Sequence, residues 1–362
     1  MNMLHLNRSW CLKYRKCLFS YQNVGVFVLL LMASTPAWAD NQSGNRFKSF
    51  SLSWENDVFA NTDRDYTNGL KLTWSRPLTP DEPIRGRLSG WVAAIMNHLP
   101  VAKDWGVKKD ISISVGQNIY TPEDTKRKEL IVDDRPYAGF LYAGLGLHAI
   151  SDRRKEVWEI DVGVVGPLAM SEQVQDFSHK LTGSSAVQGW DNQLNNEPAL
   201  EIIYETKWRL WQWRTDDHLG FDFIPHLGAC LGNVAIYANA GAEFRFGWYI
   251  PQDFGSCPIR AGCSLDSVTQ HPGGDSAADR LGFHIFMAVD GRAVLHDIFL
   301  DGNTFSDSHS VDRENFVSDW MAGFALNYSR YRFSYAYILR TKEFKQQHDP
   351  QIFGTLTFSF TY

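Results

Sequence analysis

Three short segments of the sequence gather side chains that could do chemistry. The first holds carboxylate and amide groups, in Glu55-Asn56-Asp57 and then in Asp63-Arg64-Asp65-Tyr66-Thr67-Asn68-Gly69. Oxygen atoms packed this closely can bind a hard cation such as calcium, with Asp57 and Asp65 as candidate ligands. A hairpin tip rich in Asn, Asp and Gly has the same composition, so both interpretations stay open.

The second segment is positively charged. Lys126-Arg127-Lys128 is followed by Asp133-Asp134-Arg135-Pro136-Tyr137. Three adjacent cations can bind the phosphate groups of an anionic lipid, which makes the three basic residues candidates for substrate binding. A solvated run of charges is the alternative.

The third segment contains a candidate general base. Val174, Phe177 and Leu181 recur at helical spacing and a glycine follows them, which predicts a short helix inside a loop. His179 points away from the apolar face of this helix. An imidazole titrates close to neutrality and can take a proton from water. Gln175, one turn earlier on the same face, could hold the imidazole or its water.

His179 can also be read as an ordinary surface histidine, one of eleven in the chain. The sequence contains no Gly-x-Ser-x-Gly motif of the kind that marks a serine esterase.

These segments need a framework, and the rhythm of the sequence indicates β-strands. Large apolar side chains alternate with small or polar ones in Phe50 to Trp54, Leu70 to Ser75, Phe244 to Trp248 and Tyr331 to Tyr337. Such alternation predicts a barrel wall with lipid outside and a polar interior, in which arginines face inward and aromatic rings face the bilayer. The final residues, Leu356 to Tyr362, resemble the closing strand of an outer-membrane barrel.

Strands are predicted at 47–56, 66–76, 110–118, 138–148, 156–165, 199–213, 219–228, 234–248, 282–301, 318–328, 329–340 and 352–362. The fold class is therefore an all-β transmembrane antiparallel barrel of about twelve strands, with a short helix in an extracellular loop. If both termini lie in the periplasm, the connections 57–66, 119–137 and 166–198 lie outside the cell, and the three chemical segments share one face. The long connection at 78–105, with a helix-like stretch at 90–96, is unusual for a periplasmic turn.

The first 39 residues have the layout of a secretory signal peptide: four basic residues, an apolar run from Val24 to Ala33, and Ala37-Trp38-Ala39. We expect the mature barrel to span 40–362. Its balance is 31 basic against 41 acidic residues, because four of the 35 basic residues leave with the signal. Nucleic-acid binding is not expected. No apolar run after residue 40 is long enough for a membrane helix, yet aromatic residues make up 14% of the chain.

Three cysteines remain after residue 40. Cys257 and Cys263 flank a short loop and could pair in an oxidising periplasm, whereas Cys230 would stay a buried thiol. No His and Cys residues have the spacing of a zinc site.

Taken together, the segments resemble the outer-membrane lipid A 3′-O-deacylase family. The matching stretches, in the family's order, are Asn56-Asp57, Asp65-Tyr66-Thr67-x-Gly69-Leu70, Gln117 to Pro122, Lys126-Arg127-Lys128, Asp161-x-Gly163 to Pro167, Glu172 to Gln175, His179, Gly183 and Trp190-Asp191-x-Gln193. The resemblance is concentrated in the first half of the chain. In the second half mainly the strand rhythm agrees.

The resemblance implies a function and roles for individual residues. His179 is the base, Asn56, Asp57, Thr67 and Gln175 belong to the catalytic site, and Lys126 is a site cation. Calcium is the implied cofactor, stabilising the oxyanion while water attacks the ester, and Asn56 could instead donate to that oxyanion. Ser185 stands where the family can carry a glutamate.

Three hypotheses follow from the sequence. The first is a calcium-dependent lipid A deacylase in the outer membrane, monomeric, with its site facing the cell exterior and lipopolysaccharide as its substrate. The second is an outer-membrane phospholipase with similar chemistry. The third is a non-catalytic barrel, either a pore or an adhesin, whose polar loops are only solvated tips.

Overall fold

The computed structural model describes residues 48–57, 65–78, 108–182, 187–256 and 280–362, without the side chains of Asp65, Thr67, Leu181 and Thr182. The predicted signal peptide, the 90–96 stretch and Cys257 with Cys263 lie outside these ranges. The chain forms two compact units. One combines Phe47–Ser171 with Gln188–Tyr362, and the other combines Met1–Arg46 with Glu172–Val187. Each unit is described by itself.

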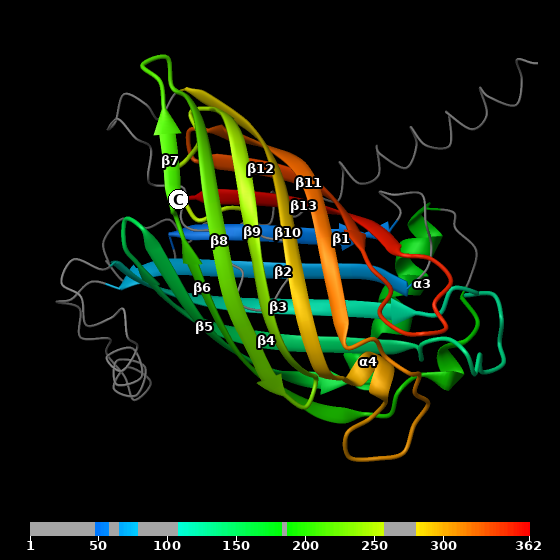
Figure 1. The fold of residues 1–362 in the computed structure, drawn as a ribbon. Helices are drawn as coiled ribbons and strands as arrows, with labels where there is room; N and C mark the ends of the chain where they lie inside the picture. Colours follow the sequence, from blue (N-terminus) through cyan, green and yellow to red (C-terminus); the bar gives the residue numbers. More distant parts are fainter. Residues whose placement is uncertain (1–47, 58–64, 79–107, 183–186, 257–279) are drawn as a thin grey trace, which may run out of the picture. The chain divides into compact units, whose positions relative to one another are not determined.

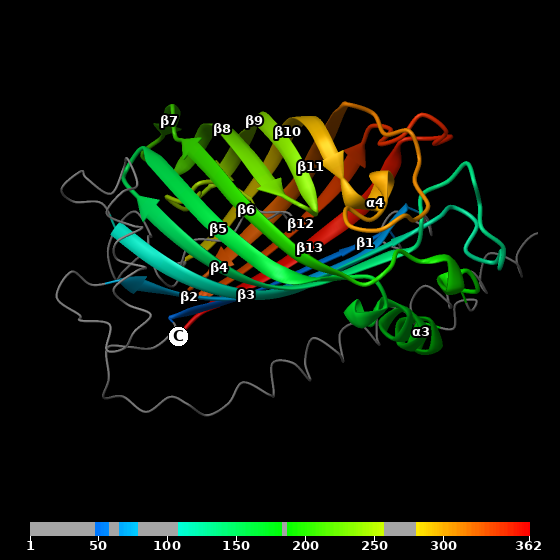
Figure 2. The same cartoon turned by 90° about the horizontal axis from the view of Figure 1, so that it is seen from below.

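The larger unit is an antiparallel β-barrel (Figures 1 and 2). Its strands are β1 (Ser49–Asn56), β2 (Asp65–Leu78), β3 (Lys108–Thr121), β4 (Ala138–Ile150), β5 (Arg154–Val165), β6 (Glu197–Trp208), β7 (Trp211–Arg214), β8 (Leu219–Gly232), β9 (Ala235–Trp248), β10 (Leu281–Asp297), β11 (Phe316–Tyr328), β12 (Tyr331–Arg340) and β13 (Gln351–Thr361). The helical elements are η3 (Pro167–Ala169), α3 (Ser171–Thr182), η4 (Trp190–Asn192) and α4 (Ile298–Asp301). None of the helices in the described ranges is both long and apolar enough to cross a membrane.

The strands form one closed ring. Each strand pairs with its sequence neighbour, except that β6 pairs with β8 and not with β7, and β1 pairs with β13 to close the ring. The short β7 pairs with the part of β8 that β6 leaves unpaired, so β6 and β7 together take one place in the ring. Among the described residues the barrel therefore has twelve strand places, as the sequence predicted.

The wall alternates as predicted between a polar inside and an apolar outside. In β13, Thr355, Thr357 and Ser359 are buried while Leu356 and Phe358 between them are partly exposed. In β9, Arg245 is completely buried, whereas Phe244, Phe246 and Trp248 are nearly half exposed. A side-chain period of two places these two sets on opposite faces. The outer face is then suited to lipid and the lumen to ion pairs.

Two predicted strands need correction. The strand predicted at 199–213 is interrupted, because Glu205, Lys207 and Arg209 point inward whereas Trp211 and Trp213 point outward. An extra residue is needed to change the phase of the alternation, and it lies at Leu210, between β6 and β7.

The strand predicted at 282–301 ends at Asp297. Its last four residues form α4, because the Asp297 side chain accepts a hydrogen bond from the Phe299 amide and caps the helix. Gly302, with φ of 82°, ends α4.

The barrel has two distinguishable ends. The loop end is the end at which β1 meets β2, β3 meets β4, β5 meets β6, and β12 meets β13; the terminus end is the end at which β1 begins and β13 finishes. All three predicted chemical segments follow strands that finish at the loop end. The positions of Glu172 to Gly183 relative to this end stay a prediction, because these residues belong to the smaller unit.

The lumen is occupied near the terminus end by residues 250–256, which we call the inner segment. Ion pairs join Asp253 in this segment to Arg245 of β9 and to Arg332 of β12. Ser256 donates its backbone N–H to the Glu243 carboxylate at 2.8 Å. Phe254 lies over the guanidinium of Arg209 at 4.7 Å.

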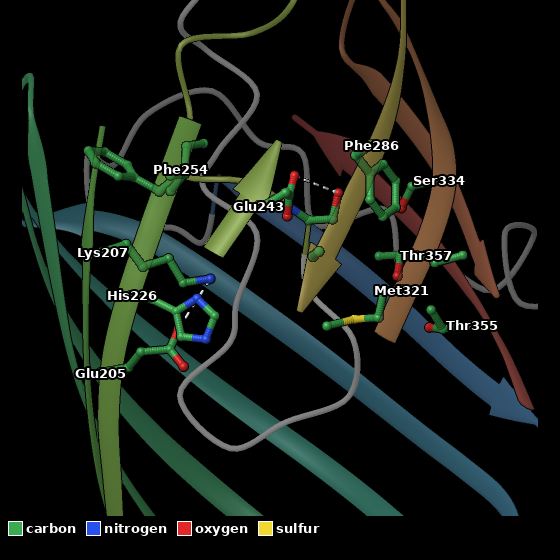
Figure 3. Close-up of a pocket in the computed structure, with 14 residues that line it drawn as sticks. Glu205, Lys207, His226, Glu243, Phe254, Phe286, Met321, Ser334, Thr355 and Thr357 are labelled. Carbon is green, nitrogen blue, oxygen red and sulfur yellow. Dashed lines mark hydrogen bonds and ion pairs between the residues drawn. The ribbon is translucent and has the colours of Figure 1, made fainter. Parts of the chain in front are cut away.

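A small cavity remains beside the inner segment (Figure 3). Its lining comes from Phe254 and Ser256 of the inner segment and from strands β6 and β8 to β13. Its volume of about 40 Å³ has room for a few water molecules but not for a lipid. Among the described residues, this cavity belongs to the lumen and not to the loop end, where the candidate chemistry lies.

Candidate functional site

Asn56 is fixed in the wall at the loop end. It is the last residue of β1 and pairs with Asn68 of β2 and with Gly354 of β13. Its Nδ2 donates a hydrogen bond to Oδ1 of Asn68 at 3.3 Å, and Nε1 of Trp54 donates to the same oxygen at 2.8 Å. Asn56 is buried, although it stands at the end of a strand.

The pairing shows which face of the wall Asn56 occupies. Trp54 pairs with Leu70, and both are partly exposed on the apolar outer face. Because side chains alternate along a strand, Asn56 and Asn68 lie on this same outer face, two residues farther toward the loop end. The predicted site residue Asn56 therefore lies on the apolar side of the wall, where its side chain is buried.

Asp57 directly follows β1 and has no exposed surface. Glu55, two residues earlier in β1, is also buried, and it lines an interior cavity of about 120 Å³ with Tyr66 and Tyr120. Both acidic side chains at the end of β1 are therefore buried.

Thr67 lies in a β-bulge. β2 pairs with β3 at Tyr66 opposite Tyr120 and at Asn68 opposite Ile119, which leaves Thr67 as the extra residue. Bulges re-aim side chains and are common beside active sites. With Leu70 and Leu72 facing lipid, unbroken alternation would turn Thr67 inward, but the bulge interrupts the alternation at this residue. The inward direction of Thr67 stays a prediction.

The predicted cations lie in the connection between β3 and β4, at the loop end. Lys126, Arg127 and Lys128 are exposed. The backbone around them is held in place, since Lys126 donates its N–H to Asp124 at 3.1 Å and the Lys128 carbonyl accepts from Asn192 at 2.8 Å. The loop therefore presents three charges to the surroundings on an ordered backbone.

The chain after β5 folds back onto the outer wall. Gln117 of β3 donates its Nε2 to the carbonyl of Ala169 at 2.6 Å. At Gly139 of β4, an added Cβ would stand 2.0 Å from the Ser171 hydroxyl, so only glycine allows this close approach. These contacts fasten η3 and the first residue of α3 to β3 and β4.

α3 carries the predicted base. Gln175 and His179 are one turn apart and share one side of the helix; Gln175 is buried and His179 is half-buried. Val174 and Phe177, on the other side, are 37% and 55% exposed. From Glu172 onward α3 belongs to the smaller unit, so the distance from His179 to Asn56 and Asp57 stays a prediction.

The residues at the end of β1 suit calcium chemically but do not form a complete site. The Asp57 carboxylate and the Asn56 amide supply the oxygen ligands that calcium prefers. Among the described residues, no three His, Cys, Asp or Glu side chains come together as a metal-binding group. Asp65, the second predicted ligand, has no described side chain, so its role as a ligand stays a prediction.

Sequence reasoning did not assign roles to Asn68 and Gly139. The sequence contained a signal for Asn68. It is a polar residue at an outward position of its strand, and the next outward residues, Leu70 and Leu72, are apolar. Gly139 had no comparable signal, since its importance depends on Ser171, which is 32 positions away.

The closed antiparallel ring, its polar lumen and its apolar outer wall define a transmembrane β-barrel protein, with candidate catalytic groups at one end. The family model of the outer membrane protein LpxR matches residues 26–362. The chain belongs to this family and is an outer-membrane protein.

A solved structure shares the fold. LpxR from Salmonella typhimurium is similar with a TM-score of 0.67 and 21% sequence identity, over 87% of this chain and 100% of that one. The β domain of the Bordetella autotransporter BrkA gives a TM-score of 0.44 and 7% identity, over 87% of this chain and 99% of that one. No curated protein sequence matches the chain.

Proposed function

We propose that this protein is a calcium-dependent lipid A 3′-O-deacylase of the outer membrane, with His179 as the general base. The observation that carries the proposal is the match to the outer membrane protein LpxR family over residues 26–362. The proposal places the loop end at the cell exterior, where lipid A lies in the outer leaflet.

The geometry of the larger unit supports this function. Asn56 occupies the outer face of the wall at the loop end, and the exposed Lys126, Arg127 and Lys128 belong to the same end. Lipid A is both apolar and phosphorylated, so a site for it needs an apolar wall beside cations. The barrel supplies both, with Leu70 and Leu72 on the wall below Asn56.

The reaction is hydrolysis by water. His179 takes a proton from water as the water oxygen bonds to the ester carbonyl carbon. The carbonyl oxygen becomes an oxyanion. When it re-forms the double bond, the bond between the carbonyl carbon and the sugar oxygen breaks, and His179 returns the proton to that oxygen. The products are the free acyloxyacyl acid and a hydroxyl group on lipid A.

The other site residues orient this step. Gln175 holds the imidazole or its water from the preceding turn of α3. The amide of Asn56 is available either as a hydrogen-bond donor to the oxyanion or, through Oδ1, as a metal ligand. Calcium, when bound by Asp57 and Asp65, supplies positive charge that stabilises the oxyanion. The three lysine and arginine side chains bind the phosphate groups and set the register of the substrate.

Substitution of the base tests the mechanism. His179→Ala should reduce acyl release from lipid A by about 10²- to 10⁴-fold, the usual contribution of a general base. The measurement is mass spectrometry of lipid A from cells that express the chain, and of purified lipid A incubated with the protein in calcium or in a chelator. His348→Ala is the matched control, because His348 is an exposed histidine in another loop of the same end.

Each outcome separates the hypotheses. Loss of one acyloxyacyl chain that needs both calcium and His179 supports the proposal. Unchanged lipid A with fatty acid released from glycerophospholipid would identify a phospholipase instead. Full activity of His179→Ala would show that another group is the base, and full activity in chelator would remove calcium from the mechanism.

A further inference from the structure

Asn68 stands directly opposite Asn56 on the outer face of the wall. It is a polar residue in a row that continues with Leu70 and Leu72. Its side-chain oxygen accepts two hydrogen bonds, from Nε1 of Trp54 at 2.8 Å and from Nδ2 of Asn56 at 3.3 Å. Asn68 is thus a half-buried amide among apolar residues, and its oxygen accepts two hydrogen bonds. Packing of the wall alone does not explain a polar side chain at this position.

The two hydrogen bonds fix the direction of both amides. The indole N–H of Trp54 can only donate, so Asn68 must turn its oxygen, and not its nitrogen, toward the indole. The same oxygen can only accept, so Asn56 must present its nitrogen to Asn68. Oδ1 of Asn56 is thereby turned away from Asn68. Because Trp54 can only donate, it determines the orientation of the Asn56 amide through Asn68.

The backbone holds this arrangement in register. Asn68 is the residue at which β2 resumes pairing with β3 after the bulge at Thr67, and its partner Ile119 has no exposed surface. Asn56 is paired on both sides, with Asn68 and with Gly354. Neither backbone can shift along its neighbours without breaking several ladder hydrogen bonds, so the amide contact is kept at a constant distance.

We propose that Asn68, held by Trp54, is a positioning residue that sets the orientation of the Asn56 amide for deacylation. The inference rests on the proposed function, in which Asn56 acts on the oxyanion or the metal. Asn68 acts only through Asn56: its hydrogen bond determines which atoms of the Asn56 amide face the substrate. A rotated amide would offer an oxygen where a donor is needed, or the reverse.

A double-mutant cycle tests the proposal on the full-length protein in detergent micelles with purified lipid A and calcium. Asn68→Ala should lower kcat by about 10- to 100-fold, as loss of an orienting partner does, with KM unchanged. Asn68→Asp keeps the accepting oxygen and should restore most of kcat. Trp54→Phe keeps the ring but removes the donor, and should fall between the two.

The combination with Asn56→Ala decides whether Asn68 acts through Asn56. The double variant should be no slower than Asn56→Ala alone, since the hydrogen bond from Asn68 then has no amide to orient.

The calcium concentration at half-maximal rate is a second readout. If this concentration rises in Asn68→Ala, the Asn56 oxygen is assigned to the metal. If it does not change, the Asn56 N–H is assigned to the oxyanion. Ser53→Ala is the matched control. Ser53 lies in β1, as Asn56 does, and the substitution removes its hydrogen bond of 3.4 Å to Thr357 of β13.

Two results would overturn the inference: an unchanged kcat in Asn68→Ala, or losses that multiply in the double variant. Heat-modifiable migration in gels verifies that each barrel is folded. Failure of the proposed function has a different signature, because the wild-type protein itself would then release no acyl chain from lipid A.

Discussion

The loop end is held together by individual ion pairs between distant parts of the chain. Arg135, in the connection after β3, contacts Glu343 in the connection after β12 at 2.6 Å, and Arg340 contacts the same carboxylate at 3.3 Å. Burial alone would raise the pKa of Glu343, but the guanidinium groups of Arg135 and Arg340 outweigh it and hold the pKa below its usual value. Glu343 therefore stabilises the folded barrel as a carboxylate.

This pair gives a prediction about stability and pH. A lowered pKa means that the stabilisation is present above the ordinary pKa of a free glutamate, about 4.3, and is lost as the pH falls through the pKa of the folded state. Glu343→Gln should destabilise the barrel at pH 7 by about 3–5 kcal/mol, because it removes the buried negative charge that Arg135 and Arg340 share.

The measurement is urea unfolding in detergent between pH 7 and pH 3. The difference between wild type and Glu343→Gln should shrink as the pH falls below about 4. Glu129→Gln, an exposed glutamate in the connection after β3, should match the wild type throughout. A difference that stays constant down to pH 3 would rule out the charge of Glu343 as the source of the stabilisation.

At the same scale, the sequence proposed some candidate site residues and gave no role to others, for physical reasons. Asn56 and Asp57 were proposed because carboxylate and amide groups cluster at the end of a clear strand. Asn68 belongs to the same cluster, but its role depends on a hydrogen bond to Trp54 across two strands, which composition does not encode. The bulge at Thr67 was hidden because one extra residue leaves the surrounding alternation intact on either side.

Among elements, alternation predicted the strands well because lipid and lumen impose opposite demands on successive side chains. It failed where a local signal competes with it. Asp297 and Gly302 are a helix cap and a helix stop, and they mark α4 inside a run of apolar residues that also suits a strand. The alternation likewise changes phase between β6 and β7. Arg209 still points inward, whereas Trp211, also an odd-numbered residue, points outward.

The contacts of η3 and of Ser171, the first residue of α3, with the wall give a prediction for Gly139. In Gly139→Ala, the new Cβ would approach the Ser171 hydroxyl to 2.0 Å and its Cβ to 2.6 Å, so the start of α3 must move. Because α3 carries His179, we expect deacylation to fall by at least about tenfold, as a displacement of roughly 1 Å commonly costs more than that, while the barrel still folds.

The double variant Gly139→Ala with Ser171→Gly should recover part of the activity, since it removes the two closest clashing atoms. Gly291→Ala in β10 is the matched control, because an added Cβ there meets only the Ala240 carbonyl, at 3.8 Å. Unaltered acyl release by Gly139→Ala would mean that the close contact does not position α3.

On the scale of the whole barrel, the lumen is occupied at two levels. The inner segment spans it near the terminus end through Asp253, which bridges Arg245 of β9 and Arg332 of β12. Near the loop end, Tyr120 stacks on Phe299 at 4.0 Å, and Arg135 lies over Tyr120 at 5.6 Å. Among the described residues, side chains of the protein thus cross the lumen at both levels.

A barrel closed at two levels should not conduct ions, which distinguishes it from the pore hypothesis. In planar bilayers the wild type should show no stable conductance steps.

Two variants test the two levels separately. Asp253→Ala frees the inner segment from both arginines, and Glu343→Ala releases Arg135. Each single variant should stay closed because the other level remains, whereas the double variant should open transiently. Asp217→Ala, at an exposed turn of the terminus end, should behave like the wild type. Steady channels in the wild type would mean that neither level seals the lumen, and would support the pore hypothesis.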